Sequence, residues 1–511
     1  MRNSLTLPLT LAAALLLGCG NDKRAAAPAA KPAAGPKTEL LLRLHFAGSA
    51  QLVANTNTAK LGQIAALPAS AKLREQVLQK LARELPARLL LGTNAASSEE
   101  SALLRPLLED LRQAESLFTL FDTAGRAPAW ALMVRLDEAR ARAWQTNSVL
   151  SQTKLAVSRN APWVFLASEG QPVRWAANQS ETSTPPFGIG TNVWLEGEAN
   201  LAKLAPLLDL PTNVPWPHVQ FSLSSKGDTV RTEAHLRFAQ SPRLALDAWR
   251  VPTNSLRDPL VSFTAARGGA DWLGQQPLLK QLDLKPLPNQ FFAWSRTDIP
   301  YQTLAALPAP GAAKQVEQLG ARAPAVLNSN LQQRTLGKLF LVTNRNELIW
   351  QGLPLLLPFV RSAPEPGGDF LLAGLMAGLI PQGANTNPPP RELFAQLERT
   401  NLVYYDWEIT ETRLQQWRQI SQLLTMLTMS MPGATAPAGG AWLDAVTPKL
   451  GNTITEVTAV SPTELRLVRS SHLGLTGVEL VLLAHWLDNP AFPSLHSPAP
   501  PPMLGAPPVP K

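Results

Sequence analysis

Several residue types and motifs that enzymes rely on are scarce in this chain. Its 511 residues include one cysteine, so an internal disulfide and a CxxC thiolate metal site are excluded. The six histidines show neither the HExxH pattern nor another i, i+4 metal spacing. A GxSxG elbow, a P-loop and a complete GxGxxG are also absent, since residues 188–190 (GIG) lack the remaining glycine. The sequence therefore predicts no metal and no cofactor.

Charge and long apolar runs are limited as well. Charged residues make up 16% of the chain, and its net charge of +8 is not gathered into a dense Lys/Arg block interleaved with aromatic residues. Because nucleic-acid binding requires such a patch, we expect no nucleic-acid partner. The apolar segments 352–360 and 370–380 are shorter than the roughly 18 residues of a membrane span, so both are expected to be buried segments. The 14 tryptophans are scattered singly, which favours a role in core packing.

The single cysteine, Cys19, follows an N-terminus typical of a secretory signal. Arg2 supplies positive charge, and Leu5 to Leu17 form an apolar region too short to span a bilayer. Residues 16–19 (LLGC) resemble the lipobox of bacterial lipoproteins. The resemblance implies that residues 1–18 are a signal peptide and that Cys19 is acylated (palmitate) and becomes the new N-terminus. The alternatives are an ordinary cleaved signal with an incidental cysteine, or a buried cysteine acting as a small hydrophobe.

The residues after Cys19 indicate sorting and a tether. Gly20 and Asn21 follow directly and Asp22 comes only third, so the resemblance implies the outer membrane, facing the periplasm. Residues 19–37 are rich in Ala, Pro and Lys and predict a stiff tether, partly polyproline II. Residues 489–511 are Pro-rich and predict a disordered tail, with a polyproline II ligand as the alternative.

Between the tether and the tail, strand-like and helix-like segments alternate, which predicts an α+β fold. Residues 38–48 and the pair within 115–136 are expected as strands, and 69–86 and 97–113 as helices, the latter with a capping box of Ser97 and Glu100. We expect two tandem halves, 38–254 and 255–488, each a mostly antiparallel sheet with helices packed on one face.

Two weak internal echoes suggest that these halves are duplicated. Residues 163–175 resemble 339–350, and 191–208 resemble 400–417, where a strand is followed by an amphipathic helix. A hairpin follows each of the latter two segments, at 218–238 and at 453–471. Chance similarity of common strand–helix order remains the alternative to duplication.

One catalytic-looking motif is present. Ser151 and Lys154 form an SxxK pair, as in penicillin-binding proteins and β-lactamases, where the amine activates the hydroxyl. Ser158 and Asn160 give an SxN, but much closer than in that family, and residues 449–451 lack the hydroxyl residue of a KTG-type strand. A chance SxxK is therefore the favoured interpretation.

Two further groups of residues could form a site. Asp406 and Glu408 share one face of a strand and could serve glycoside cleavage, although a solvent-facing role is favoured because the alternate residues are apolar. The helix expected at 413–432 carries Trp417, Met426 and Met429, which could bind a hydrophobic ligand. Core packing is the more common role of such a stripe.

These observations favour a lipid-anchored envelope protein of uncharacterised role, acting in non-enzymatic binding or scaffolding. Its expected partners are membrane lipid, through acylated Cys19, and an envelope protein. Two alternatives remain open. One is a cell-wall serine hydrolase or transpeptidase-like enzyme using Ser151 and Lys154. The other is a carrier of hydrophobic (lipid) ligands using the 413–432 helix.

Overall fold

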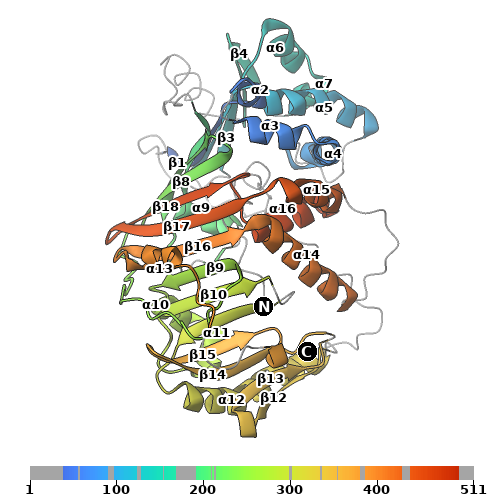
Figure 1. Ribbon diagram of the computed structural model, residues 1–511. Helices are drawn as coiled ribbons and strands as arrows, with labels where there is room; N and C mark the ends of the chain where they lie inside the picture. The colour runs from blue at the N-terminus through green and yellow to red at the C-terminus, as the bar shows by residue number, and fades with distance from the viewer. Residues whose placement is uncertain are drawn as a thin grey trace, which may run out of the picture. The chain divides into compact units, whose positions relative to one another are not determined.

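The computed structural model describes residues 38–55, 58–89, 97–123, 128–153, 155–168, 192–208, 210–211, 214–297, 302–333, 336–353, 355–379, 386–427 and 438–493 (Figure 1). The chain divides into two compact units. Unit 1 comprises Met1–Asp228, Ala434–Val446 and Glu479–Lys511, and unit 2 comprises Thr229–Gly433 and Thr447–Val478. The boundary expected near residues 254–255 lies inside unit 2.

The sheet of unit 1 is antiparallel, with the strand order β4-β5-β3-β2-β1-β6-β7. The strands expected at 38–48 and within 115–136 are confirmed as β1 and as the hairpin β2–β3. The strands are β1 (Thr38–Phe46), β2 (Ser116–Thr123), β3 (Ala129–Arg135), β4 (Ala156–Asn160), β5 (Trp163–Ala167), β6 (Val193–Asn200) and β7 (His218–Lys226).

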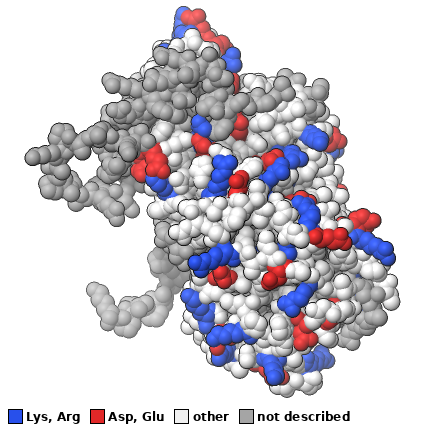
Figure 2. All heavy atoms as spheres, turned by 90° about the vertical axis from the view of Figure 1, so that its left-hand side faces the viewer, with Lys and Arg blue, Asp and Glu red and all other residues white. Residues whose placement is uncertain are grey.

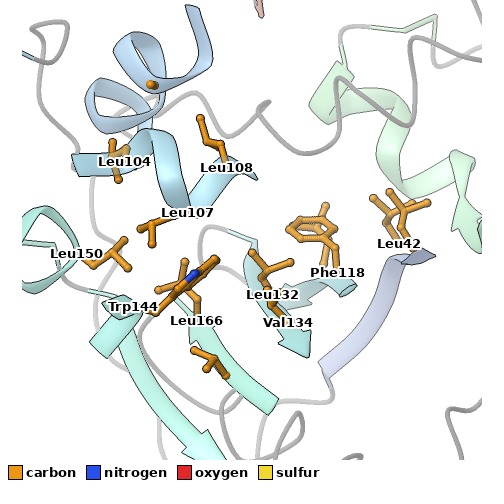
Figure 3. Packing of buried hydrophobic residues seen from close by; sticks show 14 of the residues in the cluster. Leu42, Leu104, Leu107, Leu108, Phe118, Leu132, Val134, Trp144, Leu150 and Leu166 are labelled. Atoms are coloured by element: carbon orange, nitrogen blue, oxygen red, sulfur yellow. The ribbon is translucent and has the colours of Figure 1, made fainter. Parts of the chain in front are cut away.

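Helices cover one face of this sheet and enclose its main core. Both predicted helices are confirmed, as α4 (Pro68–Leu89) and α5 (Ser98–Gln113), and α5 begins with the expected capping box of Ser97 and Glu100. Figure 3 shows leucines of α5 and Trp144 gathered on the same side of the strands that carry Leu132 and Leu166. The remaining helices that begin in unit 1 are α2 (Ser49–Ala54), α3 (Ala59–Ala65), α6 (Glu138–Gln145), α7 (Ser148–Ser151), α9 (Leu201–Leu204), η2 (Ala205–Leu208) and α15 (Ala438–Val446).

The sheet of unit 2 is also antiparallel and has the order β12-β13-β14-β15-β11-β10-β9-β16-β17-β18-β8. The hairpin expected at 453–471 is confirmed as β17–β18. The strands are β8 (Thr229–Arg237), β9 (Leu260–Arg267), β10 (Gln290–Arg296), β11 (Thr303–Pro308), β12 (Lys338–Val342), β13 (Glu347–Gln351), β14 (Phe359–Glu365), β15 (Gly368–Gly374), β16 (Leu402–Ile409), β17 (Asn452–Ser461) and β18 (Glu464–Ser471).

Helices lie on both faces of the unit 2 sheet, so the expectation of helices on one face is wrong for this unit. On one face, Phe263 and Tyr405 pack with leucines of α13 (Arg391–Ala395) and η5 (Gln396–Glu398). The opposite face is covered by α12 (Ala312–Gln333) over β12–β15 and by α14 (Thr410–Leu427) beside β16 (Figure 1). The remaining helices that begin in unit 2 are α10 (Ala270–Gln275), α11 (Pro277–Leu282), η3 (Thr343–Arg345), η4 (Ala377–Leu379), η6 (Thr447–Lys449) and α16 (Gly477–Asp488), which continues into unit 1.

The strand order of unit 1 recurs within unit 2 as β14-β15-β11-β10-β9-β16-β17. The register recurs as well. His45 faces Glu196 on one neighbouring strand and Leu117 on the other, as Ala265 faces Tyr405 and Phe292. The register irregularities also coincide, between residues 193 and 195 of β6 and between residues 402 and 404 of β16. The hairpin β12–β13 has no equivalent among the described strands of unit 1.

The two sequence echoes therefore have different outcomes. The segments 191–208 and 400–417 form β6–α9 and β16–α14, which occupy equivalent places in strand order and register. The segments 163–175 and 339–350 do not correspond, because β5 is equivalent to β15 whereas 339–350 lies in β12–β13. Residues 169–175 lie outside the described residues.

Each of the two apolar segments is buried only in part. In 370–380, residues 370–372 are buried as expected, but the expectation is wrong for Leu379, which is 46% exposed. In 352–360 the expectation is wrong for Leu355 and Leu357, whose exposed fractions are 73% and 37%, because they lie in the connection between β13 and β14. Among the described residues, no helix combines the length and apolar character that crossing a bilayer requires. The coarse expectation of an α+β fold with antiparallel sheets is confirmed.

Candidate functional site

A buried group of polar side chains lies between α14 and the sheet of unit 2. Alternation along β16 places Asp406 and Glu408 on one face, as expected. The expectation that this face is solvated is wrong, because α14 covers it and the two residues are 8% and 5% exposed. We call the following set the polar layer: Ser262, Thr264, Ser295, Asp406, Glu408, Thr410, Arg413, Thr453 and Thr455.

Strand register places the members of the polar layer opposite one another. Asp406 faces Thr264 on β9 and Thr455 on β17, and the Thr264 hydroxyl donates to Asp406 Oδ1 at 2.6 Å. Next to Thr455 on β18, Arg469 donates from Nε to the Thr455 hydroxyl at 2.9 Å. This row thus alternates charged groups with hydroxyl groups that bind them.

The second row is centred on Glu408, which faces Ser262 on β9 and Thr453 on β17. The Thr410 hydroxyl donates to Glu408 Oε1 at 3.1 Å and lies 2.6 Å from the Thr453 hydroxyl. The same carboxylate oxygen accepts the backbone N–H of Gly477, the first residue of α16, at 2.7 Å. A hydroxyl has one proton, so Thr453 donates to Thr410 when Thr410 donates to Glu408.

From α14, one cation faces this layer. Arg413 donates from Nη1 to the Thr303 hydroxyl at 3.1 Å and to Gln416 Oε1 at 2.9 Å. Gln416 in turn donates to the carbonyl of Arg296 at 2.9 Å. The Arg413 guanidinium lies 4.4 Å from the centre of the Trp417 ring. These hydrogen-bond partners are neutral, and the ring adds a cation–π contact.

Burial shifts the pKa of two charged groups, Glu408 on β16 and Arg413 on α14. Burial is the main cause that raises the pKa of Glu408 to about 7, and the nearby charge of Asp406 adds to it. Hydrogen bonds from Gly477 and Thr410 and the charge of Arg413 act in the opposite direction. Burial also lowers the pKa of Arg413 to about 10, against the raising effect of Glu408 and Asp406. Arg413 thus stays charged at neutral pH, whereas Glu408 titrates there.

Ser151 of the SxxK motif belongs to unit 1, whereas the polar layer belongs to unit 2. Ser151 ends α7 in unit 1, is exposed, and donates its hydroxyl proton to the carbonyl of Ser148 at 2.8 Å. Lys154 lies outside the described residues. The described partner of the Ser151 hydroxyl is therefore the carbonyl of its own helix.

The predicted ligand-binding residues fall on or after α14. Trp417 is half-buried against Arg413. The side chain of Met426, the whole of Met429 and Cys19 lie outside the described residues. In the described part of α14, the polar residues Arg413 and Gln416 are buried beside the apolar Leu414.

His45, His235 and His472 take part in hydrogen bonds within the fold. His45, in β1 of unit 1, is 2% exposed, with Nδ1 at 3.1 Å from Glu196 Oε1 and Nε2 at 3.0 Å from Glu115 Oε1. Within the described part of the chain, no three His, Cys, Asp or Glu side chains form a group that could hold a metal ion. On the face drawn in Figure 2, Lys and Arg are interspersed with Asp and Glu.

Comparison with known proteins does not extend this picture: no family model, curated protein or solved structure matches the chain. The folded region is therefore not assigned to a characterised family, as the sequence indicated.

The sequence contains a signal for the polar layer that belongs to no known motif. Hydroxyl residues recur at alternate positions of two strands, at Ser262 and Thr264 and at Thr453 and Thr455. With the two carboxylates, these positions mark one polar face across neighbouring strands. The sequence pattern does not show whether such a face is exposed to solvent or covered by a helix. The amphipathic character of α14 does not indicate which sheet face this helix packs against.

Proposed function

We propose that this chain is a lipid-anchored protein of the cell envelope, held in the outer membrane with its fold facing the periplasm. The observation that carries the proposal is the LLGC sequence at residues 16–19, directly behind an apolar signal region. Cysteine suits this role because its sulfur forms a stable thioether to lipid. Two or three acyl chains are needed, since one chain, at about 0.8 kcal/mol per buried CH₂, binds a membrane only marginally.

The composition after Cys19 supports the same role. The first described strand begins at Thr38, so residues 20–37 separate the acylation site from the fold. A chain of this Ala/Pro/Lys composition would reach roughly 55 Å as polyproline II. That reach would let the fold act at a distance from the bilayer.

We further propose that the protein acts by binding or scaffolding, with an envelope protein as partner, and not as an enzyme. What supports this is the chemistry of the described candidates. The Ser151 hydroxyl donates to a helix carbonyl, which does not favour the serine hydrolase alternative. The buried residues in the described part of α14 include Thr410, Arg413 and Gln416 beside Leu414, and this mainly polar surface does not favour the hydrophobic-ligand carrier.

We also propose that the two halves of the chain arose by duplication. Support comes from seven strand pairs of matching order, β1/β9, β2/β10, β3/β11, β4/β14, β5/β15, β6/β16 and β7/β17, with matching register irregularities. Chance would have to reproduce the spatial order of seven strands and the place of the register irregularity, and not only the order of elements along the chain.

The test of the anchor is Cys19→Ala in cells supplied with labelled palmitate. We expect the wild-type protein to carry the label and the variant to lose it and retain its signal peptide, because the acylation site is gone. Thr10→Ala, within the apolar signal region, is the matched control and should be labelled like the wild type. Unchanged labelling of Cys19→Ala would overturn the proposal.

A further inference from the structure

Unit 1 provides an internal comparison for the polar layer of unit 2. The shared register gives each member of the layer an equivalent residue in unit 1. The pairs are Ser262/Leu42, Thr264/Leu44, Ser295/Leu120, Asp406/Gly197, Glu408/Ala199, Thr410/Leu201, Arg413/Leu204, Thr453/Val219 and Thr455/Phe221. The comparison uses register alone and does not depend on a common origin of the halves.

The equivalent positions in unit 1 are apolar. Apart from Gly197, all of them belong to the main hydrophobic core of unit 1 or pack against it. Ala199 occupies the place of Glu408, and Leu204 that of Arg413. The same strand arrangement is thus stabilised by hydrocarbon in one unit and contains buried charge in the other.

This contrast indicates that the fold does not require the polar layer. Burying a carboxylate and a guanidinium costs several kcal/mol per ion, and replacing such groups with well-packed apolar residues is often neutral or stabilising. A buried ionisable group that the fold can do without is a candidate for a functional role.

Glu408 is the carboxyl group of the layer that lies where several elements meet. It lies on β16, directly before α14, and Thr410 at the start of α14 donates to its carboxylate. Thr453 continues this hydroxyl chain into β17, and Gly477 donates from α16. The protonation state of Glu408 therefore acts on the three elements that meet at the N-terminus of α14.

We propose that Glu408 is a proton-binding site that controls how tightly α14 is held on the sheet of unit 2. When the proton is bound, the buried carboxyl is neutral and α14 packs closely over it. When the proton is released, a carboxylate beside Asp406 remains under the helix, and α14 separates from the sheet more often. The ligand of the site is the proton, and the working range is near neutral pH.

Other charged groups around Glu408 could contribute to a pH response. Asp406 lies on the same strand face, and Arg413 faces it from α14. Arg469 on β18 and Arg296 at the end of β10 are buried along the layer, and Lys449 of η6 is exposed. His472 accepts the N–H of Gly451 at 2.7 Å, and the Gly451 carbonyl accepts the N–H of Thr410 at 3.1 Å. The experiment must therefore separate Glu408 from His472.

The test is hydrogen exchange of the α14 amides, measured by mass spectrometry on the full-length protein in detergent micelles. Exchange is corrected for its intrinsic pH dependence, so that the opening equilibrium of α14 is obtained. With a Glu408 pKa of about 7 in the closed state and the ordinary 4.5 in the open state, this equilibrium should rise about tenfold from pH 6 to pH 8. A wild-type opening equilibrium that changes less than twofold over this range would overturn the proposal.

Two variants assign the response to Glu408. Glu408→Gln keeps the shape and the acceptor oxygen but cannot ionise, so its opening equilibrium should change less than twofold between pH 6 and pH 8. Glu408→Ala, which installs the residue found at 199, should likewise lose the response, and it replaces Gln if that variant does not fold. Glu411→Gln, on the same helix, is the matched control and should keep the tenfold rise. A tenfold rise retained in Glu408→Gln or Glu408→Ala would assign the response to another group, such as His472, and contradict the proposal.

Discussion

The buried contact of His45 with two carboxylates predicts a large loss of stability for His45→Leu. Both ring nitrogens lie within hydrogen-bonding distance of carboxylate oxygens, and both can donate when the ring is an imidazolium, the form that the raised pKa of His45 favours. The side chains of Glu115 and Glu196 are each 11% exposed. The His45→Leu substitution therefore leaves two nearly buried carboxylates without the imidazolium that binds both of them. Breaking a buried pair by removing one partner costs about 3–5 kcal/mol, so we expect a loss of about 3 kcal/mol in unit 1 at pH 6.

The same contact predicts the direction of the pH dependence. Burial by itself would lower the pKa of His45, but the hydrogen bonds to Glu115 and Glu196 outweigh it, so the pKa lies above the ordinary 6.5. Native unit 1 therefore binds this proton more tightly than the unfolded chain does. The stabilisation is complete below pH 6.5 and declines as the pH rises through the raised pKa. The difference between wild type and His45→Leu should shrink accordingly.

The assay is urea denaturation of the full chain, read by hydrogen exchange of peptides from β1 and β6, so that the result refers to unit 1. His218→Leu is the control, because its ring lies 3.9 Å from Glu198 and its side chain is 38% exposed. Such an exposed pair contributes about 1 kcal/mol or less. The reasoning is refuted if His45→Leu costs no more than His218→Leu, or if the wild-type stability of these peptides is the same at pH 6 and pH 9.

Two further substitutions test the packing of the sheets. Gly197→Ala would place its Cβ 2.6 Å from the carbonyl oxygen of Arg43, so a loss of about 1–3 kcal/mol is expected by denaturant unfolding, whereas Gly62→Ala, with open space around it, should not destabilise. Arg267→Leu removes donors to the carbonyls of Leu402, Asp247 and Thr400, and a loss of at least about 2 kcal/mol in unit 2 is expected. A loss below 1 kcal/mol at Arg267 would show that other groups or water satisfy these carbonyls.

Local patterns predicted several of the individual elements. The capping box at Ser97 and Glu100 fixed the start of α5, because its two hydrogen bonds involve residues three apart in sequence. Segments 191–208 and 400–417 were also recognised, because each joins an alternating strand to an amphipathic helix. Such signals lie within one stretch of chain and need no knowledge of the partner strands.

Features that depend on distant partners could not be predicted in the same way. The polar faces of β9, β16 and β17 have the sequence pattern of solvent-facing strand faces. They are buried only because α14 packs over them. His45 belongs to no sequence motif, and its carboxylate partners are 70 and 151 residues away in sequence. The equivalence of β5 with β15, and not with β12, likewise follows from strand pairing and not from local similarity.

The division of the chain into units also bears on how the protein reaches its folded state. Unit 1 is built from the first 228 residues together with 434–446 and the stretch that begins at residue 479. Trp442 donates to Ser70, and Lys80 to the carbonyl of Leu487, so α4 is held by residues made at the end of synthesis. During synthesis, α4 emerges early but can make these two contacts only after residues near the end of the chain have been made. A single proteolytic cut within 229–433 would therefore leave two fragments, and each unit would contain residues from both of them.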